Sequence, residues 1–503
     1  MLQDTTPKEP SAMPIPLIDV FAGPGGLNEG FSSLIDAAGE PIFQTVASFE
    51  LDPWACETLK LRSAVRHYRR IDRVAPSSYY EFLRSGGRGL ADLKVHSEMA
   101  VGFKEAESEV VCMALGPQTR PESDHIIESA LQRHGGKDDW VLIGGPPCQA
   151  YSLAGRSRRK GDPTFADDHK HVLYKEYLAI LERFRPSVFV MENVKGMLSS
   201  KHAGGAIFQS IRDDLSSAGY DLRSFVIPGS DPSPSDFIIR SENYGIPQRR
   251  HRVILLGVRH GTTLDSAGVL EEAMAPVTVE QAIGGLPRIR SMVSPRNRDS
   301  EVEWRRARDT AWLIAGRSGG RTAPTPDIGA AYLDEPAGDI VGELGDWLLD
   351  DRLGGVTLHE SRAHMTKDLM RYGYLAQKAV MGERPKLGDL PDELVPNHKN
   401  ARDVNAPFTD RFRVQVSGQA STTVVSHISK DGHYYIHPDP VQMRSLSVRE
   451  AARLQTFPDD YFFVGGRTQQ YHQVGNAVPP LLARQLGEVV ARMFGRKVDT
   501  QRL

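Results

Sequence analysis

Short apolar runs that end in glycine, proline or an acidic residue recur along the first half of the chain. They occupy residues 15–21, 45–49, 140–143, 187–191 and 253–257. Continuous apolar runs of this length are typical of strands buried on both faces of a parallel sheet. The first run leads through the glycine-rich segment 22–27 into an apparent helix from Asn28 onward. The pattern predicts an α/β fold with a doubly wound, mostly parallel sheet.

The second half of the chain has a different pattern. Between about residues 261 and 441, glycine and proline breakers recur among mixed charges, which predicts an inserted, less regular domain. At its end, residues 422–424 and 427–436 predict a hairpin. Residues 446–457 predict an amphipathic helix, and a last helix is expected to end near Arg492. We therefore divide the chain into a disordered tail (1–14), a first domain (15–260), an inserted smaller domain (261–441) and a C-terminal return that completes the first domain (442–503).

Composition is that of an ordinary soluble globular protein, because 40% of the 503 residues are hydrophobic and 25% are charged. The three cysteines include no CxxC pair, so we expect neither a disulfide framework nor a cysteine zinc site, and a reducing cytoplasm fits best. Residues 1–16 lack the features of a signal peptide, and no apolar stretch is long enough to span a membrane. We therefore expect a cytoplasmic protein without a metal site or a membrane partner.

Charge gives a local signal rather than a global one. The net charge of −3 argues against binding of polyanions through overall charge. Basic residues nevertheless cluster at 156–160, 248–252 and 305–308. Most such clusters are solvated faces, but a local patch is enough to contact nucleic-acid phosphates.

Candidate chemistry begins with Pro146-Pro147-Cys148-Gln149, which follows the apolar run 140–143 and a Gly-Gly break. The two prolines fix φ and stiffen the loop that presents the thiol. A structural cysteine would more often lie inside the apolar run, where it behaves as a small hydrophobe. The position therefore favours a nucleophilic thiol, with an inert buried cysteine as the alternative.

The glycine-rich segment 22–27 predicts a ligand site of its own. Glycines in the first turn of a doubly wound sheet let the main chain approach a nucleotide-like ligand closely. Glu50 ends the second apolar run, at a separation suited to an acid that binds ribose hydroxyls. The pair suggests an adenosine-containing cofactor, although similar turns also occur in proteins that bind no nucleotide, and the G-x-G-x-x-G spacing is missing.

Read together, residues 19–26 and 145–149 resemble the DNA (cytosine-5)-methyltransferases. Four further blocks follow in the family's order, namely 191–194, 248–252, 444–458 and 473–480. The resemblance is close before about residue 259 and after about residue 442, and weak between them. It implies a Rossmann-like methyltransferase fold that depends on S-adenosylmethionine. In that fold, residues 15–260 form the catalytic and cofactor-binding domain and residues 261–441 form a target-recognition domain.

The family resemblance also implies a mechanism. The Cys148 thiolate would add to C6 of a cytosine that has been flipped out of duplex DNA, and C5 would then accept the methyl group. Glu192 would donate to ring N3, Arg252 would contact the exocyclic oxygen, and Asn193 would hold the catalytic loop. A turn-forming asparagine, a surface glutamate and a plain basic edge strand are the alternative interpretations. The catalytic candidates are Cys148, Gln149, Glu192, Asn193, Arg250 and Arg252.

Two further sets of contacts follow from the resemblance. The candidates for binding S-adenosylmethionine are Phe21, Gly23, Gly25, Gly26, Leu27, Glu50, Pro147, Asn476 and Val478. Phe21 is equally compatible with a core position. The family's acid that contacts the adenine amino group is not recognisable within the long stretch 60–139. The candidates for contacting DNA are Arg156, Arg158, Arg159, Gln248 and Thr423, of which the first three lie in a segment that resembles the family's mobile catalytic loop.

The expected partner is double-stranded DNA, and the protein is expected to act as a monomer. The sequence leaves open a separately encoded restriction or antiphage defence complex. Three other functions compete: an RNA cytosine-5 methyltransferase, a catalytically silent DNA-binding scaffold and a nicotinamide dehydrogenase. The large recognition region argues against the first, and the intact Cys148, Glu192 and Arg252 argue against the second. The missing dinucleotide spacing argues against the third.

Overall fold

The computed structural model describes residues 13–135, 139–147, 169–199, 201–202, 205–266, 268–316, 325–385, 387–397, 401 and 411–499. Within them, an eight-stranded sheet has the order β3-β2-β1-β4-β5-β11-β8, with β9 paired to β11. Its strands are β1 (Ile15–Val20), β2 (Phe43–Glu50), β3 (Val110–Cys112), β4 (Val141–Gly144), β5 (Val188–Val194), β8 (Tyr220–Arg223), β9 (Ile238–Arg240) and β11 (His251–Arg259). The adjacent strands β3, β2, β1, β4 and β5 pair in parallel, and β11 pairs antiparallel with each of its neighbours. The predicted doubly wound, mostly parallel sheet is confirmed.

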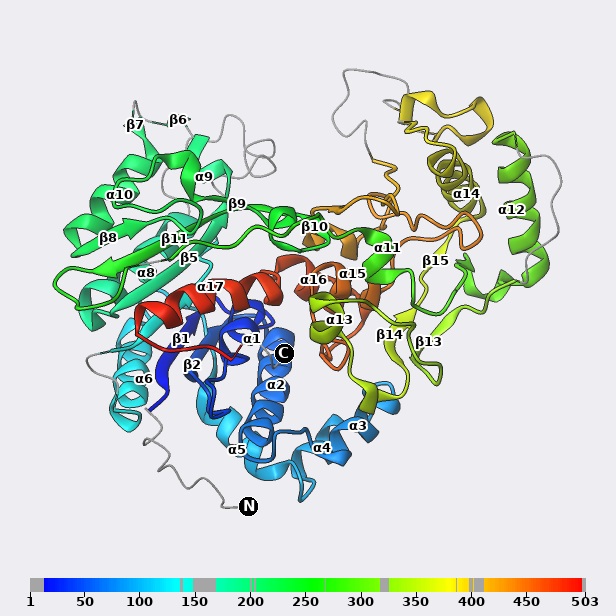
Figure 1. The fold of residues 1–503 in the computed structure, drawn as a ribbon. Helices are drawn as coiled ribbons and strands as arrows, with labels where there is room; N and C mark the ends of the chain where they lie inside the picture. The colour runs from blue at the N-terminus through cyan, green and yellow to red at the C-terminus, as the bar shows by residue number, and fades with distance from the viewer. Residues whose placement is uncertain are drawn as a thin grey trace, which may run out of the picture.

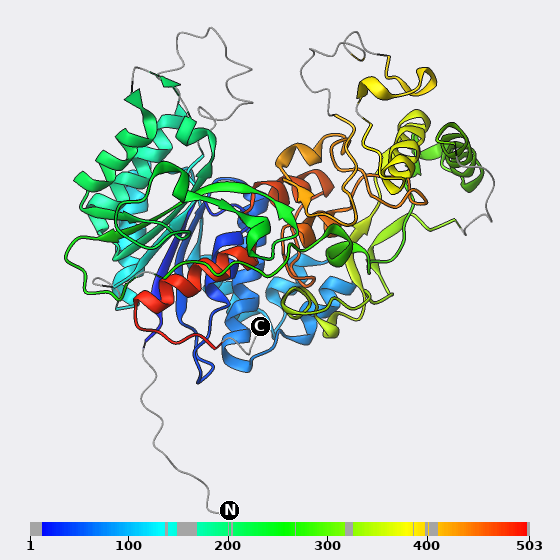
Figure 2. The same cartoon turned by 45° about the horizontal axis from the view of Figure 1, so that its top comes forward.

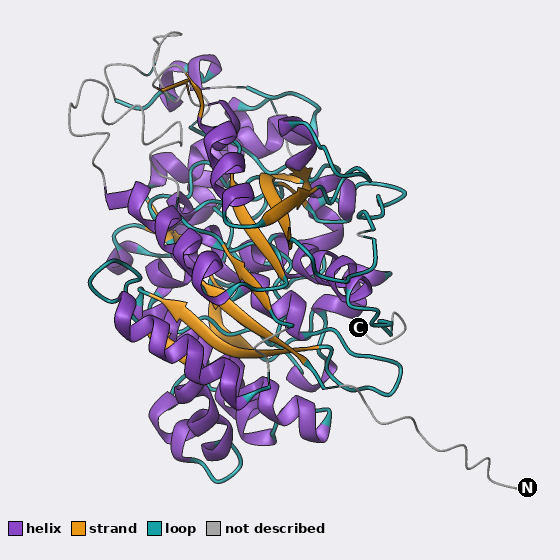
Figure 3. Cartoon of the chain, turned by 90° about the vertical axis from the view of Figure 1, so that its left-hand side faces the viewer, coloured by secondary structure: helices purple, strands orange, loops and turns teal. Residues whose placement is uncertain are grey.

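Helices cover both faces of this sheet (Figure 3). Alternate side chains of β1 point to opposite faces, so Leu17 joins one hydrophobic core and Ile18 the other. The first core is completed by α1 (Gly26–Ser32), α2 (Pro53–Asp72) and α17 (Pro480–Met493). The second is completed by α6 (Arg120–Arg133), α8 (His169–Phe184) and α10 (Ile207–Ser217). Both faces of the strands are therefore buried, which explains their continuous apolar runs.

The long stretch 60–139 contributes a helical unit and the third strand of the sheet. It contains most of α2, then α3 (Ser77–Arg84), α4 (Leu90–Val95) and α5 (Ala100–Glu109), and it continues through β3 into α6. The unit lies beside residues of the segment 261–441 (Figure 1). The Tyr80 hydroxyl donates to Asp350 Oδ2 at 2.7 Å, and the Arg84 guanidinium donates to backbone carbonyls of Arg352 and Leu353. The stretch therefore joins the sheet to residues 350–353 of the segment 261–441.

A second lobe lies beside the sheet and has small cores of its own (Figure 2). Its helices are α11 (Val279–Ile283), α12 (Glu301–Ile314), α13 (Glu343–Leu348) and α14 (Thr366–Val380). Its strands are β12 (Met292–Val293), β13 (Gly329–Leu333), β14 (Val356–Glu360) and β15 (Ala363–His364). The chain then returns through α15 (Val448–Leu454) and α16 (Arg467–Asn476) to α17. The remaining short elements are β6 (Lys201–His202), β7 (Gly205–Ala206), α9 (Gly196–Ser199), β10 (Gln248–Arg249) and β16 (Ser421–Thr422).

Two local predictions near the end of the chain were wrong. Residues 422–436 do not form a hairpin, because β16 pairs in parallel with β10, residues Ser426–Ser429 form a 3-10 helix, and Ile436 bridges Val414 and Ser445. The helix expected at 446–457 spans only Val448–Leu454 and is not amphipathic, because all seven of its residues are buried. Its charged side chains are neutralised internally, and Arg453 forms an ion pair with Asp459. The last helix ends at Met493, as predicted.

The cysteine prediction also needs a correction. Cys56 in α2 and Cys112 at the end of β3 form a disulfide in the structure. Sequence spacing did not indicate this pair, because the two residues are 56 positions apart and meet only after α2 packs beside β3. Cys148 lies outside the described residues.

Candidate active site

The candidate site lies where the strand order of the sheet reverses. From β1 the chain moves outward to β2 and β3 and then returns to β4 on the other side of β1. Such a switch point opens a crevice at the carboxyl ends of the two central strands, where doubly wound proteins bind ligands. Here the end of β1 carries the turn 21–25, and the end of β4 carries residues 145–147. The fold therefore places the glycine turn beside residues 145–147, which precede Cys148 in the sequence.

The turn after β1 has an unusual backbone that glycine permits. Gly23 and Gly25 have φ of 56° and 92°, and the Gly25 amide donates to the Ala22 carbonyl at 2.9 Å. Phe21 also has a positive φ of 58°, and its half-buried ring packs against the second core. A Cβ added to Gly23 would meet no atom within 4 Å. The turn is thus tightly folded yet open on its outer side.

Glu50 holds this turn from the end of the neighbouring strand. Its Oε2 accepts a hydrogen bond from the Gly23 amide at 2.7 Å, and its Oε1 accepts from the amides of Leu51 and Asp52 at 2.8 Å. Two residues further on, Asp52 caps α2, because its side chain accepts hydrogen bonds from the amides of Trp54 and Ala55. Glu50 is therefore both a structural anchor of the turn and a carboxylate at the mouth of the crevice.

The C-terminal return touches the turn directly. A Cβ on Gly26 would lie 2.1 Å from the Val478 carbonyl oxygen, so only glycine fits beneath that residue. Val478 is buried and supports α1, as does Leu27 in the first core. Asn476 is exposed at the end of α16, with its Nδ2 3.3 Å from His472 Nδ1. Of the residues expected at the methionine end of the cofactor, only Asn476 presents its side chain to solvent.

The second half of the site forms at the ends of β4 and β5. The strands pair through Gly144 and Met191, which places Glu192 beside Gly145. A Cβ on Gly145 would stand 3.2 Å from Glu192 Oε2. Asn193 Nδ2 donates to the Pro146 carbonyl at 3.3 Å, so the amide holds the segment that leads into Cys148. Pro147 is exposed at the edge of the described segment.

Arg252 faces Glu192 from the neighbouring antiparallel strand. Its Nε lies 2.7 Å from Glu192 Oε1, and both side chains keep about 15% of their surface exposed (16% and 14%). Arg250 lies deeper, where its Nη1 donates to the carbonyls of Val424 at 2.9 Å and Gly475 at 3.4 Å. Burial, together with the neighbouring Arg252 cation, lowers the pKa of Arg250 to about 9. Arg250 thus supports the site from below, while Arg252 reaches its surface.

The DNA-contact prediction for Gln248 was wrong. Its side chain is fully buried, and its Nε2 donates to the Leu454 carbonyl and to Gln455 Oε1. Its Oε1 accepts from the Val424 amide, so every polar atom of the side chain is used inside the protein. Thr423 is half-buried and donates to the Arg249 carbonyl at 2.6 Å. The other candidates, Gln149, Arg156, Arg158 and Arg159, lie with Cys148 outside the described residues.

Within the stretch 60–139, the structure shows which strand lies where the family's adenine-contacting acid would be expected. The strand next to β2 is β3, and the residues that follow it, Met113 to Gly116, include no acid. Met113 instead donates its amide to the Glu50 carbonyl at 2.9 Å. The carboxylate that the family places after this strand therefore has no counterpart at the described end of β3.

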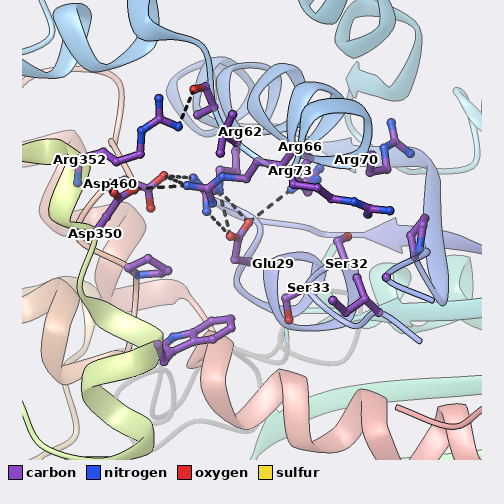
Figure 4. A pocket seen from close by; sticks show the side chains of 18 of the residues that line it. Glu29, Ser32, Ser33, Arg62, Arg66, Arg70, Arg73, Asp350, Arg352 and Asp460 are labelled. Atoms are coloured by element: carbon purple, nitrogen blue, oxygen red, sulfur yellow. Dashed lines mark hydrogen bonds and ion pairs between the residues drawn. The ribbon is translucent and has the colours of Figure 1, made fainter. Parts of the chain in front are cut away.

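A cavity of about 550 Å³ lies away from this crevice, near the start of β2 and the end of α2 (Figure 4). Its wall carries arginines of α2, including Arg62, Arg66 and Arg70, and acids such as Glu29 and Asp460. It contains none of the candidate site residues. Among the described residues, no cluster of three or more metal-ligating side chains occurs, and no helix is long and apolar enough to cross a membrane.

Comparison with known proteins gives a consistent result. The family model described as C-5 cytosine-specific DNA methylase matches residues 133–314 and 339–492. The type II methyltransferase M.Bpa9945I of Bacillus paralicheniformis is 33% identical over 496 residues, which cover 94% of this chain and 98% of the relative. M.AgeI of Thalassovita gelatinovora is 29% identical over 77% of this chain and 90% of its own length. A solved structure described as a candidate DNA modification methyltransferase from an E. coli prophage has the same fold, with a TM-score of 0.54, 20% identity and coverage of 96% and 100%.

Proposed function

The chain belongs to the C-5 cytosine-specific DNA methylase family, and from this membership we propose that it methylates C5 of one cytosine within a short recurring sequence of duplex DNA. The observation that carries the proposal is the ion pair of Glu192 with Arg252. The pair lies beside residues 145–147, at the same edge of the sheet as the glycine turn. An acid and a guanidinium thus lie beside residues 145–147, which precede Cys148 in the sequence, at the edge of the sheet where doubly wound proteins bind ligands.

S-adenosylmethionine is the methyl donor that we propose for the glycine turn. The open outer side of Gly23 leaves room for a ligand, and Glu50 Oε2 accepts one hydrogen bond from protein. A carboxylate oxygen accepts a second donor readily, so Glu50 fits a ribose hydroxyl. Phe21, Gly25, Pro147 and Asn476 would complete the contacts, with Gly26, Leu27 and Val478 supporting the turn. When bound, the cofactor supplies an electrophilic methyl group.

The remaining chemistry belongs to residues of this chain. The Cys148 thiolate adds to C6 of the flipped cytosine, which makes C5 nucleophilic and places negative charge on the ring. Glu192, oriented by Arg252, donates a proton to N3 and neutralises that charge. After C5 has accepted the methyl group, a water molecule takes the proton from C5 as the thiolate leaves C6, and N3 returns its proton to the Glu192 carboxylate, which restores the neutral aromatic ring. Each Cys148 thiolate is thereby regenerated.

Arg252 and its neighbours orient the base. A guanidinium carries five N–H donors, and those not used by Glu192 and the His251 carbonyl are directed to the exocyclic oxygen of cytosine. Asn193 positions the loop through Pro146, and Gln149 lies next to the nucleophile. We propose that Arg156, Arg158 and Arg159 bind phosphates of the DNA backbone, with Thr423 at the margin of the recognition region. We further propose that residues 261–441 read the target sequence.

The biological setting follows from the relatives. Because the curated relatives are named type II methyltransferases, we propose that this protein marks host DNA beside a restriction endonuclease encoded separately. Protection against foreign DNA, including phage DNA, would follow from that pairing. We place the protein in the cytoplasm, where the DNA is, and expect it to act as a monomer.

The first experiment is bisulfite sequencing of DNA from a methylation-free host that expresses either the wild-type protein or Cys148→Ala. Protected cytosines in one recurring context, lost in the variant, would support both the reaction and the nucleophile. Protection that persists in Cys148→Ala would remove Cys148 as the nucleophile. Unprotected DNA together with 5-methylcytosine in cellular RNA, again dependent on Cys148, would favour the RNA enzyme instead.

The covalent step has its own test. Duplex DNA with 5-fluorocytosine at the target should trap a denaturation-resistant adduct with the protein, because the fluorine cannot leave C5 as a proton does. Glu192→Gln should form this adduct at least tenfold more slowly, since the amide cannot donate the proton that N3 needs. Turnover on ordinary DNA without any trapped adduct would rule out addition at C6.

A further inference from the structure

The underside of the glycine turn is held by a tyrosine from the far end of the sequence. The Tyr461 hydroxyl donates a hydrogen bond to the Pro24 carbonyl, across a separation of 437 residues. Pro24 lies between Gly23 and Gly25, the two residues with positive φ. The same hydroxyl lies 3.3 Å from the position of a Cβ on Gly25. Tyr461 therefore touches the turn at Pro24 and Gly25, whereas the Cβ position of Gly23 meets no atom.

Tyr461 is itself fixed on all sides. Its side chain has no exposed surface, and its ring lies 4.8 Å from the ring of Phe457 and 5.3 Å from that of Phe463, centroid to centroid. The Arg62 guanidinium stacks over the ring, 4.9 Å from its centroid. A phenol held this firmly has one position for its hydroxyl, so the hydrogen bond sets where the Pro24 carbonyl points.

Arg62 extends this support to the helix that follows the turn. Its guanidinium binds both carboxylate oxygens of Glu29 in α1 and donates to Asp460 Oδ2 at 2.6 Å (Figure 4). All three side chains are buried. A fork of this kind is geometrically specific, because one planar guanidinium binds two carboxylates at once, while Arg66 also pairs with Glu29 and Arg69 with Asp460. Residues 460–461 are thus connected to the turn through Pro24 and to α1 through Arg62 and Glu29.

The hydroxyl keeps its donor role across the working pH range. Burial, reinforced by the nearby Glu29 carboxylate, raises the pKa of Tyr461 well above its ordinary value, so the phenol stays protonated. A buried phenol requires an acceptor, and many carbonyls would serve. This one uses the carbonyl of the peptide that joins Pro24 to Gly25, a peptide whose orientation glycine leaves unrestrained.

We propose that Tyr461 is a positioning residue for cofactor binding, which fixes the peptide between Pro24 and Gly25 so that the cofactor meets a preformed turn. The proposal rests on the function proposed above for that turn. Without the hydroxyl, the turn samples more conformations, and binding has to order it again. The loss therefore falls on cofactor affinity rather than on the chemical step.

The test compares Tyr461→Phe with Tyr79→Phe in the full chain. Tyr79 is a matched control, because it is equally buried and its hydroxyl donates to the carbonyl of Asp460, one residue from Tyr461, without touching the turn. Titration calorimetry with S-adenosylmethionine should show a Kd raised about three- to tenfold for Tyr461→Phe, as the loss of one hydrogen bond implies. Tyr79→Phe should stay within twofold of wild type. In steady-state assays, Tyr461→Phe should raise KM for the cofactor by a similar factor and leave kcat within twofold.

A second measurement needs no ligand. Hydrogen exchange at the peptide that contains Gly25, whose amide is bonded to Ala22, should accelerate in Tyr461→Phe and not in Tyr79→Phe. Unchanged affinity and exchange in Tyr461→Phe would overturn the proposal, as would equal effects of both variants or a fall in kcat at constant KM. A wild-type protein that binds no S-adenosylmethionine would instead overturn the cofactor assignment, and the proposal with it.

Discussion

Gly30→Ala tests how closely the C-terminal return must approach the first helix. Gly30 lies in α1 and faces α17. A Cβ at this position would stand 2.3 Å from the Arg484 amide nitrogen, 2.4 Å from the Pro480 carbonyl oxygen and 2.5 Å from the Ala483 carbonyl carbon. Ordinary contacts of a Cβ begin at 3.4 Å, so the two helices would have to separate by about 1 Å. All three neighbours are backbone atoms, and no rotamer change relieves them.

The expected cost follows from this geometry. Overpacking a close contact costs about 1–3 kcal/mol, and the absence of any movable side chain places Gly30→Ala at the upper end of that range. Alanine recovers up to about 1 kcal/mol through its higher helix propensity. We therefore expect a net loss of about 2 kcal/mol in the free energy of unfolding. Because α17 begins two residues after Val478, which contacts Gly26 of the turn, affinity for S-adenosylmethionine should fall as well.

Urea denaturation followed by circular dichroism measures this loss, with Gly116→Ala as the matched control. A Cβ on Gly116 would meet no atom within 4 Å, and the residue does not have a positive φ. The control should change the free energy of unfolding by less than about 0.5 kcal/mol. A Gly30→Ala protein as stable as wild type would refute the reasoning, because it would mean that α1 and α17 separate at no cost.

Three further outcomes are expected. Burial lowers the pKa of His359 to about 4, below its unfolded value. Its contribution to stability is therefore complete above about pH 6.5 and is lost as the pH falls toward 4. The urea midpoint of the wild-type protein should drop between pH 7 and 5, and His359→Gln should flatten that slope. Reduction of the Cys56–Cys112 disulfide should lower the free energy of unfolding by about 2–4 kcal/mol, whereas Cys112→Ser should be insensitive to dithiothreitol. Burial raises the pKa of Asp19, whose oxygens have no hydrogen-bond partner among the described residues, so wild type loses stability as the pH rises through that pKa. Asp19→Asn should therefore be about 1–3 kcal/mol more stable than wild type at pH 8 and equal to it below pH 4, and a less stable variant at pH 8 would contradict this.

The central sheet could be predicted from the sequence because burial on both faces leaves a continuous apolar run. Residues 15–21, 187–191 and 253–257 each coincide with a strand, and the strand ends carry the motifs. The family resemblance assigned Glu192 and Arg252 to one site, and they lie on neighbouring strands, but their ion pair was not predicted. Local composition and motif order were sufficient to predict these strands and the motifs at their ends.

Contacts between distant segments could not be predicted in the same way. Residues 422–436 are rich in β-branched and aromatic side chains, but their hydrogen-bonding groups pair with β10 and with residue 445 rather than with one another. Gln248 lies in β10 and Arg250 between β10 and β11, rather than on one continuous strand, and the return segment buries the Gln248 amide. In the buried fork of Arg62 with Glu29 and Asp460, Arg62 and Asp460 are 398 residues apart, so no spacing in the sequence reveals it.

The residues that complete the glycine turn are synthesised late, so the turn cannot be finished until the chain is nearly complete. The turn leaves the ribosome early, but the hydroxyl that fixes it is made 437 residues later, and the carbonyl of Val478 that seats on Gly26 follows still later. A nascent chain therefore contains Cys148 and Glu192, the proposed nucleophile and acid, well before it contains the residues that complete the turn. Methylation would begin only once the final helix has docked, so incomplete chains would be silent rather than partly active.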